Sequence, residues 1–301
     1  MTAAKELFGV VRGILDTMEM TFPCPACLSD AWAEIGIHRY WRTEHEPGGV
    51  WYRDEEVRLR RQVLFDVWFP EAAAVTLRSR RCSICGMICY APRPDNAELT
   101  SKYDFLGAAM PGSPTPGTSG LVEAADAARA SGILEALTPH LAGEGSVLDV
   151  GGRDGRLMAP FADRGFKCFL VDQMEHVRPG VRKLGDRMDD VPAHLTFDAA
   201  VCSHVLEHVA APRELLELIH DRLRSGGVVY VEVPHEVFYN NVWNPIVVQP
   251  VEHINFFTLD ALERILSGSG FTVEKAGVGL SSYDGQPLPV IRAVGVKPEA
   301  P

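Results

Sequence analysis

The sequence lacks any apolar run long enough to cross a bilayer, and its amino terminus lacks the pattern of a signal peptide. We therefore expect a cytoplasmic protein without a membrane partner. Positive charge is also scarce, because 29 Lys and Arg residues face 40 Asp and Glu residues and leave a formal net charge of -11. General nucleic-acid binding needs a basic stripe that displaces counterions, so this composition argues against a nucleic-acid partner.

Cysteine is infrequent as well, with seven in 301 residues, yet four of the seven form two matched pairs. The pairs are Cys24-Pro-Ala-Cys27 and Cys82-Ser-Ile-Cys85, and a glycine follows the second pair. Together they offer four thiolates to one tetrahedral zinc ion. The alternatives are disulfides, which a reducing cytoplasm disfavours, a redox dithiol, which leaves one pair unexplained, and unpaired buried cysteines. We predict a closed, structural zinc site.

The chain divides into three parts by composition. Residues 1–106 are the predicted zinc-binding domain, in which residues 5–20 have the apolar spacing of an amphipathic helix and residues 32–68 are expected to form strands. Residues 107–120 are rich in Pro, Gly and Ser and predict a linker or a lid. Strand and helix patterns alternate over residues 121–301, which indicates an α/β domain with a parallel sheet.

The α/β part is organised around residues 146–155, with the sequence SVLDVGGRDG. Val147, Leu148 and Val150 predict a buried strand, and the glycines that follow let the backbone turn sharply and approach a ligand. A nucleotide-like ligand would bind at the carboxyl end of such a strand, although glycine turns also occur in folds without a ligand. No Gly-Lys-Ser/Thr follows the turn, which excludes a phosphate-binding loop of that type.

A second apolar segment, residues 167–171, ends at Asp172, about twenty residues after the glycine turn. A carboxylate at this distance can accept hydrogen bonds from both hydroxyls of a ribose. Asp172 therefore favours a nucleoside-type ligand.

Residues 146–296 resemble the class I S-adenosylmethionine-dependent methyltransferases. The matching segments are, in order, LDVGGRDG at 148–155, VD at 171–172, GDRMDDVP at 185–192, FDAAVCSHVLEH at 197–208 and LRSGGVVYVEVP at 223–234. The resemblance implies a doubly wound, Rossmann-like sheet of seven strands that an antiparallel pair at 271–276 and 288–296 completes, and S-adenosylmethionine as cofactor. The four-cysteine part with its proline-rich exit at 91–94 is similar to a zinc-ribbon-like module that precedes this domain in methyltransferases of sugars and natural products.

The resemblance also implies a set of residues around the cofactor: Asp149, Gly151, Gly152, Gly155, Asp172, Asp186, Met188 and Ser203. Asp186, or else Asp189, stands where the family has an acidic residue that binds the adenine amino group, and either could instead be a solvated loop carboxylate. The chain departs from the family at Arg153, which replaces a glycine. A side chain there could crowd the methionine part of the cofactor.

Histidines near the expected cleft are the candidate bases, because a histidine pKa near neutrality suits proton removal from a hydroxyl or an ammonium group. His253, in the segment VEHINFFT, is the first candidate, followed by His204 and His208, and each could instead be structural. Glu252 is expected to orient the histidine or to bind a sugar hydroxyl. Sugar C-methyltransferases have a similar Glu-His pair after a tyrosine, where this chain has Pro250, so the departure favours O- or N-methylation.

The sequence thus predicts a zinc-containing methyltransferase that acts on a small molecule, such as a sugar, a nucleotide-linked sugar or a natural-product intermediate. The alternative is a non-catalytic cofactor-binding or scaffold protein whose zinc module binds a partner. A dinucleotide oxidoreductase fits the glycine spacing and the later motifs less well.

Overall fold

The computed structural model describes residues 22–42, 55–109, 120–236, 249–283 and 286–299. The helix expected at residues 5–20 and residues 110–119 of the expected linker lie outside this part of the chain.

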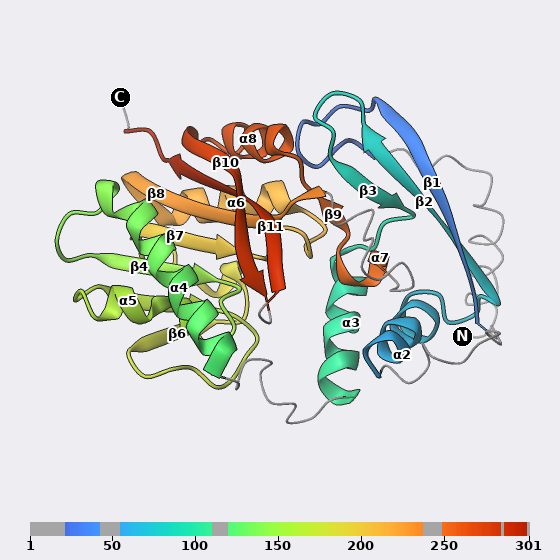
Figure 1. The fold of residues 1–301 in the computed structure, drawn as a ribbon, viewed down its shortest axis with the longest axis horizontal. Coiled ribbons are helices and arrows are strands. Elements are labelled where there is room, and N and C mark those ends of the chain that lie inside the picture. Colours follow the sequence, from blue (N-terminus) through green and yellow to red (C-terminus); the bar gives the residue numbers. More distant parts are fainter. Residues whose placement is uncertain (1–21, 43–54, 110–119, 237–248, 284–285, 300–301) are drawn as a thin grey trace.

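The larger of two sheets has seven strands, as expected. Its order is β10 (Thr272–Tyr283), β11 (Gln286–Val296), β8 (Leu223–Pro234), β7 (Phe197–Ser203), β4 (Ser146–Val150), β5 (Lys167–Val171) and β6 (Val181–Gly185). Strands β4 to β8 pair in parallel, whereas β11 runs antiparallel to both β8 and β10. The fold is therefore α/β with a mixed, Rossmann-like sheet (Figure 1).

Helices cover both faces of this sheet, so its central strands are buried on both sides. Val147 of β4 packs in a cluster with α4 (Gly120–Leu137) and α5 (Ala159–Ala162). The neighbouring Leu148 and Val150 pack in a second cluster with α6 (Pro212–Arg222) and α8 (Leu259–Gly268). Burial on both faces explains why the strands are nearly continuous apolar runs in the sequence.

The second sheet has four antiparallel strands in the order β1 (Trp32–Trp41), β2 (Ala74–Cys82), β3 (Ile88–Ala91) and β9 (Asn255–Phe256). The first three come from the amino-terminal part, whereas β9 comes from the carboxyl-terminal half of the chain. The two halves therefore share this sheet, which stands beside the larger one in Figure 1.

The expectation of strands over residues 32–68 is correct for β1 and wrong for residues 55–68. This segment forms α2 (Glu55–Gln62) and a π-helical turn, η3 (Val63–Trp68). Four of its apolar side chains are buried in the cluster beneath the smaller sheet: Val63, Leu64, Phe65 and Trp68. Leu59, Val63 and Val67 are four positions apart, which is the spacing of a helix. The expectation of strands relies instead on the aromatic and charged composition of the segment.

Helix α3 (Asn96–Ala109) connects the amino-terminal part to the larger sheet. Asp95 and Glu98 exchange side-chain to backbone hydrogen bonds of 2.8 and 3.0 Å at its start, which is a capping arrangement. Its Thr100 hydroxyl accepts a 2.8 Å hydrogen bond from Arg187, which follows β6. The shorter elements are η4 (Thr138–His140), η5 (Arg156–Met158), η6 (Met188–Asp190) and α7 (Gln249–Glu252).

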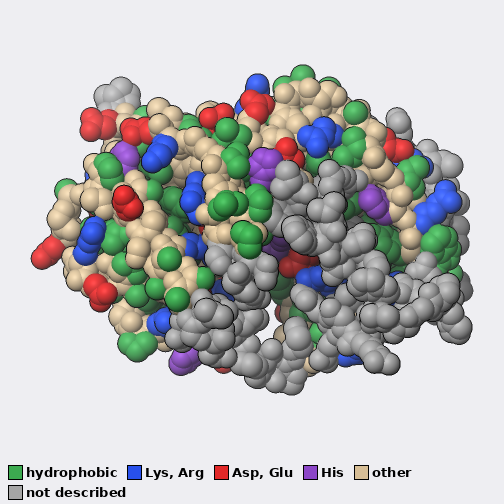
Figure 2. Space-filling model, viewed as in Figure 1, with side chains coloured by type: hydrophobic (Ala, Val, Ile, Leu, Met, Phe, Trp, Pro, Cys, Tyr) green, Lys and Arg blue, Asp and Glu red, His purple; other side chains and the backbone are tan. Residues whose placement is uncertain are grey.

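Among the described helices, none combines the length and the apolar character that a membrane span requires. On the face that Figure 2 shows, Lys and Arg side chains are interspersed with Asp and Glu side chains.

Candidate functional site

The turn after β4 leaves no room for a side chain at its glycines. Gly151 has a φ of 68°, and a Cβ there would lie 2.6 Å from Val205 Cγ2. A Cβ on Gly152 would lie 1.9 Å from Asp149 Oδ2. Gly155, with a φ of 79°, begins the short helix η5. The backbone here can therefore approach a ligand that a larger residue would exclude.

Asp149, the last but one residue of β4, lies beneath this turn. Its side chain is 1% exposed, and Oδ2 has no hydrogen-bond partner among the described residues. Burial raises the pKa of Asp149 to about 7, against the opposing effect of Arg129. A buried carboxylate with one unpartnered oxygen fits a site that receives a cationic ligand.

Asp172 follows β5 and holds two loops at once. Its Oδ2 accepts a hydrogen bond of 2.8 Å from the backbone N–H of Arg153, and its Oδ1 accepts one of 2.8 Å from the N–H of Met174. Arg153 has a φ of 59°, in the left-handed region that favours glycine. The departure from the family's glycine is therefore accommodated with some backbone strain, and the hydrogen bond to Asp172 supports this conformation.

The loop after β6 contains the acidic residues expected near an adenine. Asp186 and Asp189 are both exposed, Asp186 pairs with Lys183 at 2.5 Å, and Met188 is buried. Asp190 fixes the loop, because its Oδ2 accepts 2.9 Å hydrogen bonds from the N–H groups of Asp186 and Arg187. Both candidates thus remain on a loop beside the carboxyl end of the sheet.

A buried ionic network lies at the end of β7. Ser203 accepts a hydrogen bond of 2.5 Å from Arg129, and Glu232, which is 0% exposed, pairs with Arg129 at 2.8 Å and with Arg292 at 2.6 Å. The ring of His204 lies between two carboxylates, 3.2 Å from Glu207 and 3.3 Å from Glu232. Burial lowers the pKa of His204, but the two carboxylates outweigh it and raise that pKa. Both ring nitrogens are therefore engaged with anions.

His208 and His253, which are 45 positions apart in the sequence, come together in the structure. Their ring centroids are 4.8 Å apart at an interplanar angle of 68°. His208 Nδ1 lies 2.8 Å from the carbonyl oxygen of Glu252. Burial and then the charge of His208 lower the pKa of His253 to about 4, so this ring is neutral at physiological pH.

The segment that carries Glu252 and His253 is held by two basic residues from the amino-terminal part. Arg60 of α2 pairs with the Glu252 carboxylate at 2.8 Å, and Lys102 of α3 donates a hydrogen bond of 2.5 Å to the carbonyl of Val251. Burial would raise the pKa of Glu252, but Arg60 and the neighbouring histidines hold it at about 2. Lys102 is 4% exposed, which is rare for lysine. Neither basic residue belongs to a motif.

The four predicted zinc ligands converge at the base of the smaller sheet. Cys24 Sγ lies 3.5 Å from Cys85 Sγ, and Cys27 Sγ lies 3.5 Å from Cys82 Sγ. The contact with Cys85 lowers the pKa of Cys24, and the same contact raises the pKa of Cys85. A regular tetrahedron with zinc–sulfur bonds of about 2.3 Å has sulfur atoms roughly 3.8 Å apart, so the cluster has the dimensions of a zinc site.

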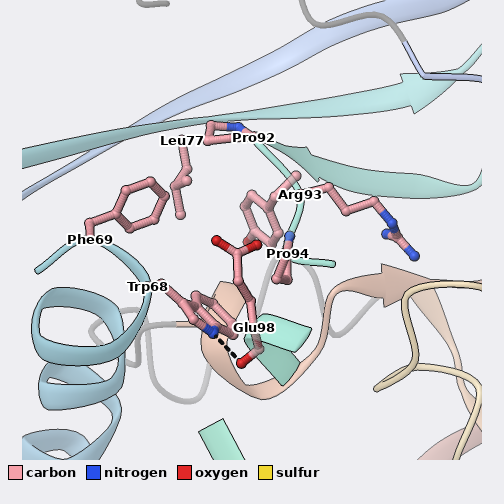
Figure 3. Close-up of a pocket in the computed structure, with 8 residues that line it drawn as sticks. Trp68, Phe69, Leu77, Pro92, Arg93, Pro94 and Glu98 are labelled. Atoms are coloured by element: carbon pink, nitrogen blue, oxygen red, sulfur yellow. Dashed lines mark hydrogen bonds between the residues drawn. The ribbon is translucent and has the colours of Figure 1, made fainter. Parts of the chain in front are cut away.

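A separate small pocket lies between the smaller sheet and α3 (Figure 3). Its lining includes Trp68, Tyr90, Pro92 and Glu98, and Trp68 Nε1 donates a 3.0 Å hydrogen bond to the Glu98 carbonyl. None of the predicted cofactor, catalytic or zinc residues lines it.

Comparisons with solved structures found similar folds among methyltransferases. The 1,6-didemethyltoxoflavin-N1-methyltransferase of Burkholderia thailandensis is 20% identical, and the match covers 74% of this chain and 96% of that chain with a TM-score of 0.53. The N-methyltransferase NodS of Bradyrhizobium japonicum is 13% identical, and the match covers 57% of this chain and 87% of that chain with a TM-score of 0.44.

A comparison with curated protein sequences found no match. The model of a family described as "Methyltransferase domain" matches residues 123–276, which is half of the chain and includes β4 to β8 and the turns after β4 and β5. The chain therefore belongs to this methyltransferase family, and the protein is a methyltransferase.

Proposed function

We propose that the protein transfers the methyl group of S-adenosylmethionine to a hydroxyl or amino group of a small molecule. The observation that carries this proposal is the arrangement at the carboxyl ends of β4 and β5. The glycine turn, Asp149 with its unpartnered Oδ2 atom, and Asp172 adjoin one another there. The Burkholderia protein of the same fold was solved with S-adenosylhomocysteine and its acceptor bound, which supports the choice of cofactor.

The residues around the turn fit a cationic nucleoside. Gly151, Gly152 and Gly155 would let the backbone approach the cofactor, and Asp149 would lie near its positive charge. Asp172 would accept the ribose hydroxyls, since each of its oxygens has a lone pair beyond the one that a backbone N–H uses. Asp186 or Asp189 would face the adenine amino group, with Met188 packed below and Ser203 at the carboxyl end of β7.

The bound cofactor supplies an activated methyl group, so the protein must place the acceptor and remove its proton. We assign proton removal to His253 first, because its ring is neutral, although its lowered pKa makes it a weak proton acceptor. His208 is second, because its hydrogen bond with the Glu252 carbonyl uses only Nδ1. The engagement of His204 with two carboxylates makes it a poor base and a good structural cation. Glu252 would orient the acceptor or the histidine from its ion pair with Arg60.

The acceptor is proposed to be a sugar, a nucleotide-linked sugar or a natural-product intermediate. Two features support this choice of acceptor. The four-cysteine part resembles modules of enzymes that methylate such molecules, and polar side chains surround His253. The N1-methyltransferase of the same fold acts on a small molecule, which agrees with an acceptor of that size.

Structural zinc at Cys24, Cys27, Cys82 and Cys85 is part of the same proposal. A closed four-thiolate site has no position for substrate, so the ion would stabilise the fold. The Thr258 hydroxyl donates a 2.5 Å hydrogen bond to the Cys85 carbonyl, and Arg213 donates one of 2.5 Å to the Ala26 carbonyl. Both contacts join the zinc loops to the methyltransferase half, on either side of the proposed division at residues 107–120.

Calorimetric titration of the zinc-loaded protein with S-adenosylhomocysteine tests the cofactor assignment. We expect one binding site with a dissociation constant on the order of 1 to 10 μM, or about 7 to 8 kcal/mol. A folded, zinc-loaded protein that does not bind S-adenosylhomocysteine would contradict the assignment.

A further inference from the structure

A second group of potential metal ligands lies beside the proposed acceptor site and consists of Glu207, His208 and His253. One donor atom from each residue lies within 4.8 Å of the others. Two imidazoles and one carboxylate are a donor set that suits divalent transition-metal ions. From this group, we infer that the protein binds a divalent cation between Glu207, His208 and His253, separate from the four-cysteine site.

The buried carboxylate of Glu207 faces three histidines and has one oxygen that no group occupies among the described residues. The side chain is 1% exposed, and Oε2 has no hydrogen-bond partner among the residues that the structure describes. The nearest positive group, His204, lies 3.2 Å from Oε1 but is shared with Glu232. Because a buried carboxylate oxygen without a partner is costly, a cation bound at Oε2 of Glu207 would stabilise it.

The ring of His208 is oriented as a metal ligand. A carbonyl oxygen can only accept a hydrogen bond, so the 2.8 Å contact with Glu252 places the proton on Nδ1. In this tautomer Nε2 carries the lone pair, and it lies 3.8 Å from Glu207 Oε1. Metal-binding histidines commonly donate their other N–H to a backbone carbonyl in this way.

The third donor, His253, could reach the same ion after a small rotation of its ring. In a tetrahedral site with bonds of about 2.1 Å, ligand atoms lie roughly 3.4 Å apart. Rotation of the His253 ring, which touches His208 edge to face, would close the remaining gap. Three protein ligands would leave a coordination position for an oxygen of the acceptor.

This inference rests on the proposed function in one respect, namely that the acceptor binds beside this group. The cation would bind an acceptor hydroxyl and lower its pKa, and the proton would leave to solvent water. The oxygen would then form its bond to the methyl carbon as the carbon–sulfur bond breaks, with the electron pair retained by sulfur. In this state His253 would hold the ion instead of removing the proton.

Cobalt(II) is the probe for the test, added to full-length protein whose four-cysteine site is already filled with zinc. Visible absorption reports octahedral or tetrahedral cobalt with nitrogen and oxygen ligands, whereas displacement of zinc would add sulfur-to-cobalt charge-transfer bands. We expect one cobalt ion per chain without those bands. We also expect at least tenfold weaker binding in His253→Ala and in Glu207→Gln.

Two controls separate metal binding from folding and from the proposed function. His194→Ala removes an exposed histidine and should bind cobalt like the wild type, and thermal denaturation should show that all variants are folded. A parallel titration with S-adenosylhomocysteine tests the cofactor site alone. No cobalt binding to zinc-loaded wild type, or unchanged binding in both His253→Ala and His208→Ala, would overturn the inference while leaving the methyltransferase assignment intact.

Discussion

Replacing Asp172 with asparagine tests the residue that connects the cofactor turn to the next strand. The carboxylate accepts one backbone N–H on each oxygen, at 2.8 Å from Arg153 and at 2.8 Å from Met174. An asparagine keeps one acceptor oxygen but presents an amide NH2 to the other N–H. One hydrogen bond to a charged acceptor is lost, which costs about 1.5–3 kcal/mol of unfolding free energy.

The same change removes the charge that the ribose hydroxyls are proposed to meet. If that interaction contributes about 1.5–3 kcal/mol, the affinity for S-adenosylhomocysteine falls roughly 10- to 150-fold. Calorimetric titration and urea denaturation measure the two effects separately, and Asp163→Asn, at an exposed carboxylate, is the matched control. A variant with lower stability but unchanged affinity would show that Asp172 only fixes the loops, and would refute its role at the ribose.

Gly152→Ala should lower the free energy of unfolding, measured by urea denaturation, by about 1–3 kcal/mol and should weaken cofactor binding, because the new Cβ would lie 1.9 Å from Asp149 Oδ2. A variant as stable as the wild type would contradict this crowding. Asp149 has a pKa raised by burial from 3.8 to about 7, so the folded protein holds its proton more tightly than the unfolded chain. Stability should therefore fall by up to about 4 kcal/mol as the pH rises from 3.8 to 7, and denaturation of Asp149→Asn should lack this slope; an identical slope in both proteins would refute it. Cys82→Ser should lose the one zinc ion per chain measured by elemental analysis and more than about 4 kcal/mol of stability. Cys202→Ser, which replaces a cysteine outside the set of four ligands, should retain its zinc, and loss of zinc in both variants would contradict the assignment.

The large sheet could be predicted because its signals are local. Apolar runs such as residues 147–150 and the glycine turn after them depend only on neighbouring residues, and the structure confirms the seven-stranded α/β fold. The Cys-x-x-Cys pairs are similarly local, and the structure brings the four sulfur atoms together as predicted.

Contacts between distant segments could not be predicted from one sequence. Nothing near Asn255 indicates that two residues form a strand beside β3, since the register of β9 depends on residues 88–89. The ion pair of Arg60 with Glu252 joins segments separated by 192 positions, and neither residue lies in a periodic pattern that identifies its partner. The bridging position of His204 between Glu207 and Glu232 likewise depends on β7 and β8 being neighbours in the sheet.

These distant contacts change the role of the amino-terminal part. Arg60 and Lys102 hold the segment of Glu252 and His253, and β9 places that segment at the edge of the smaller sheet. The cysteine loops share an apolar cluster with Phe257 and with α8 of the methyltransferase half. Separating the two parts would therefore expose a common core and release the proposed proton acceptor. The cofactor side of the site is built by local motifs within one half, whereas the acceptor side requires both halves, so zinc should influence acceptor turnover more strongly than cofactor affinity.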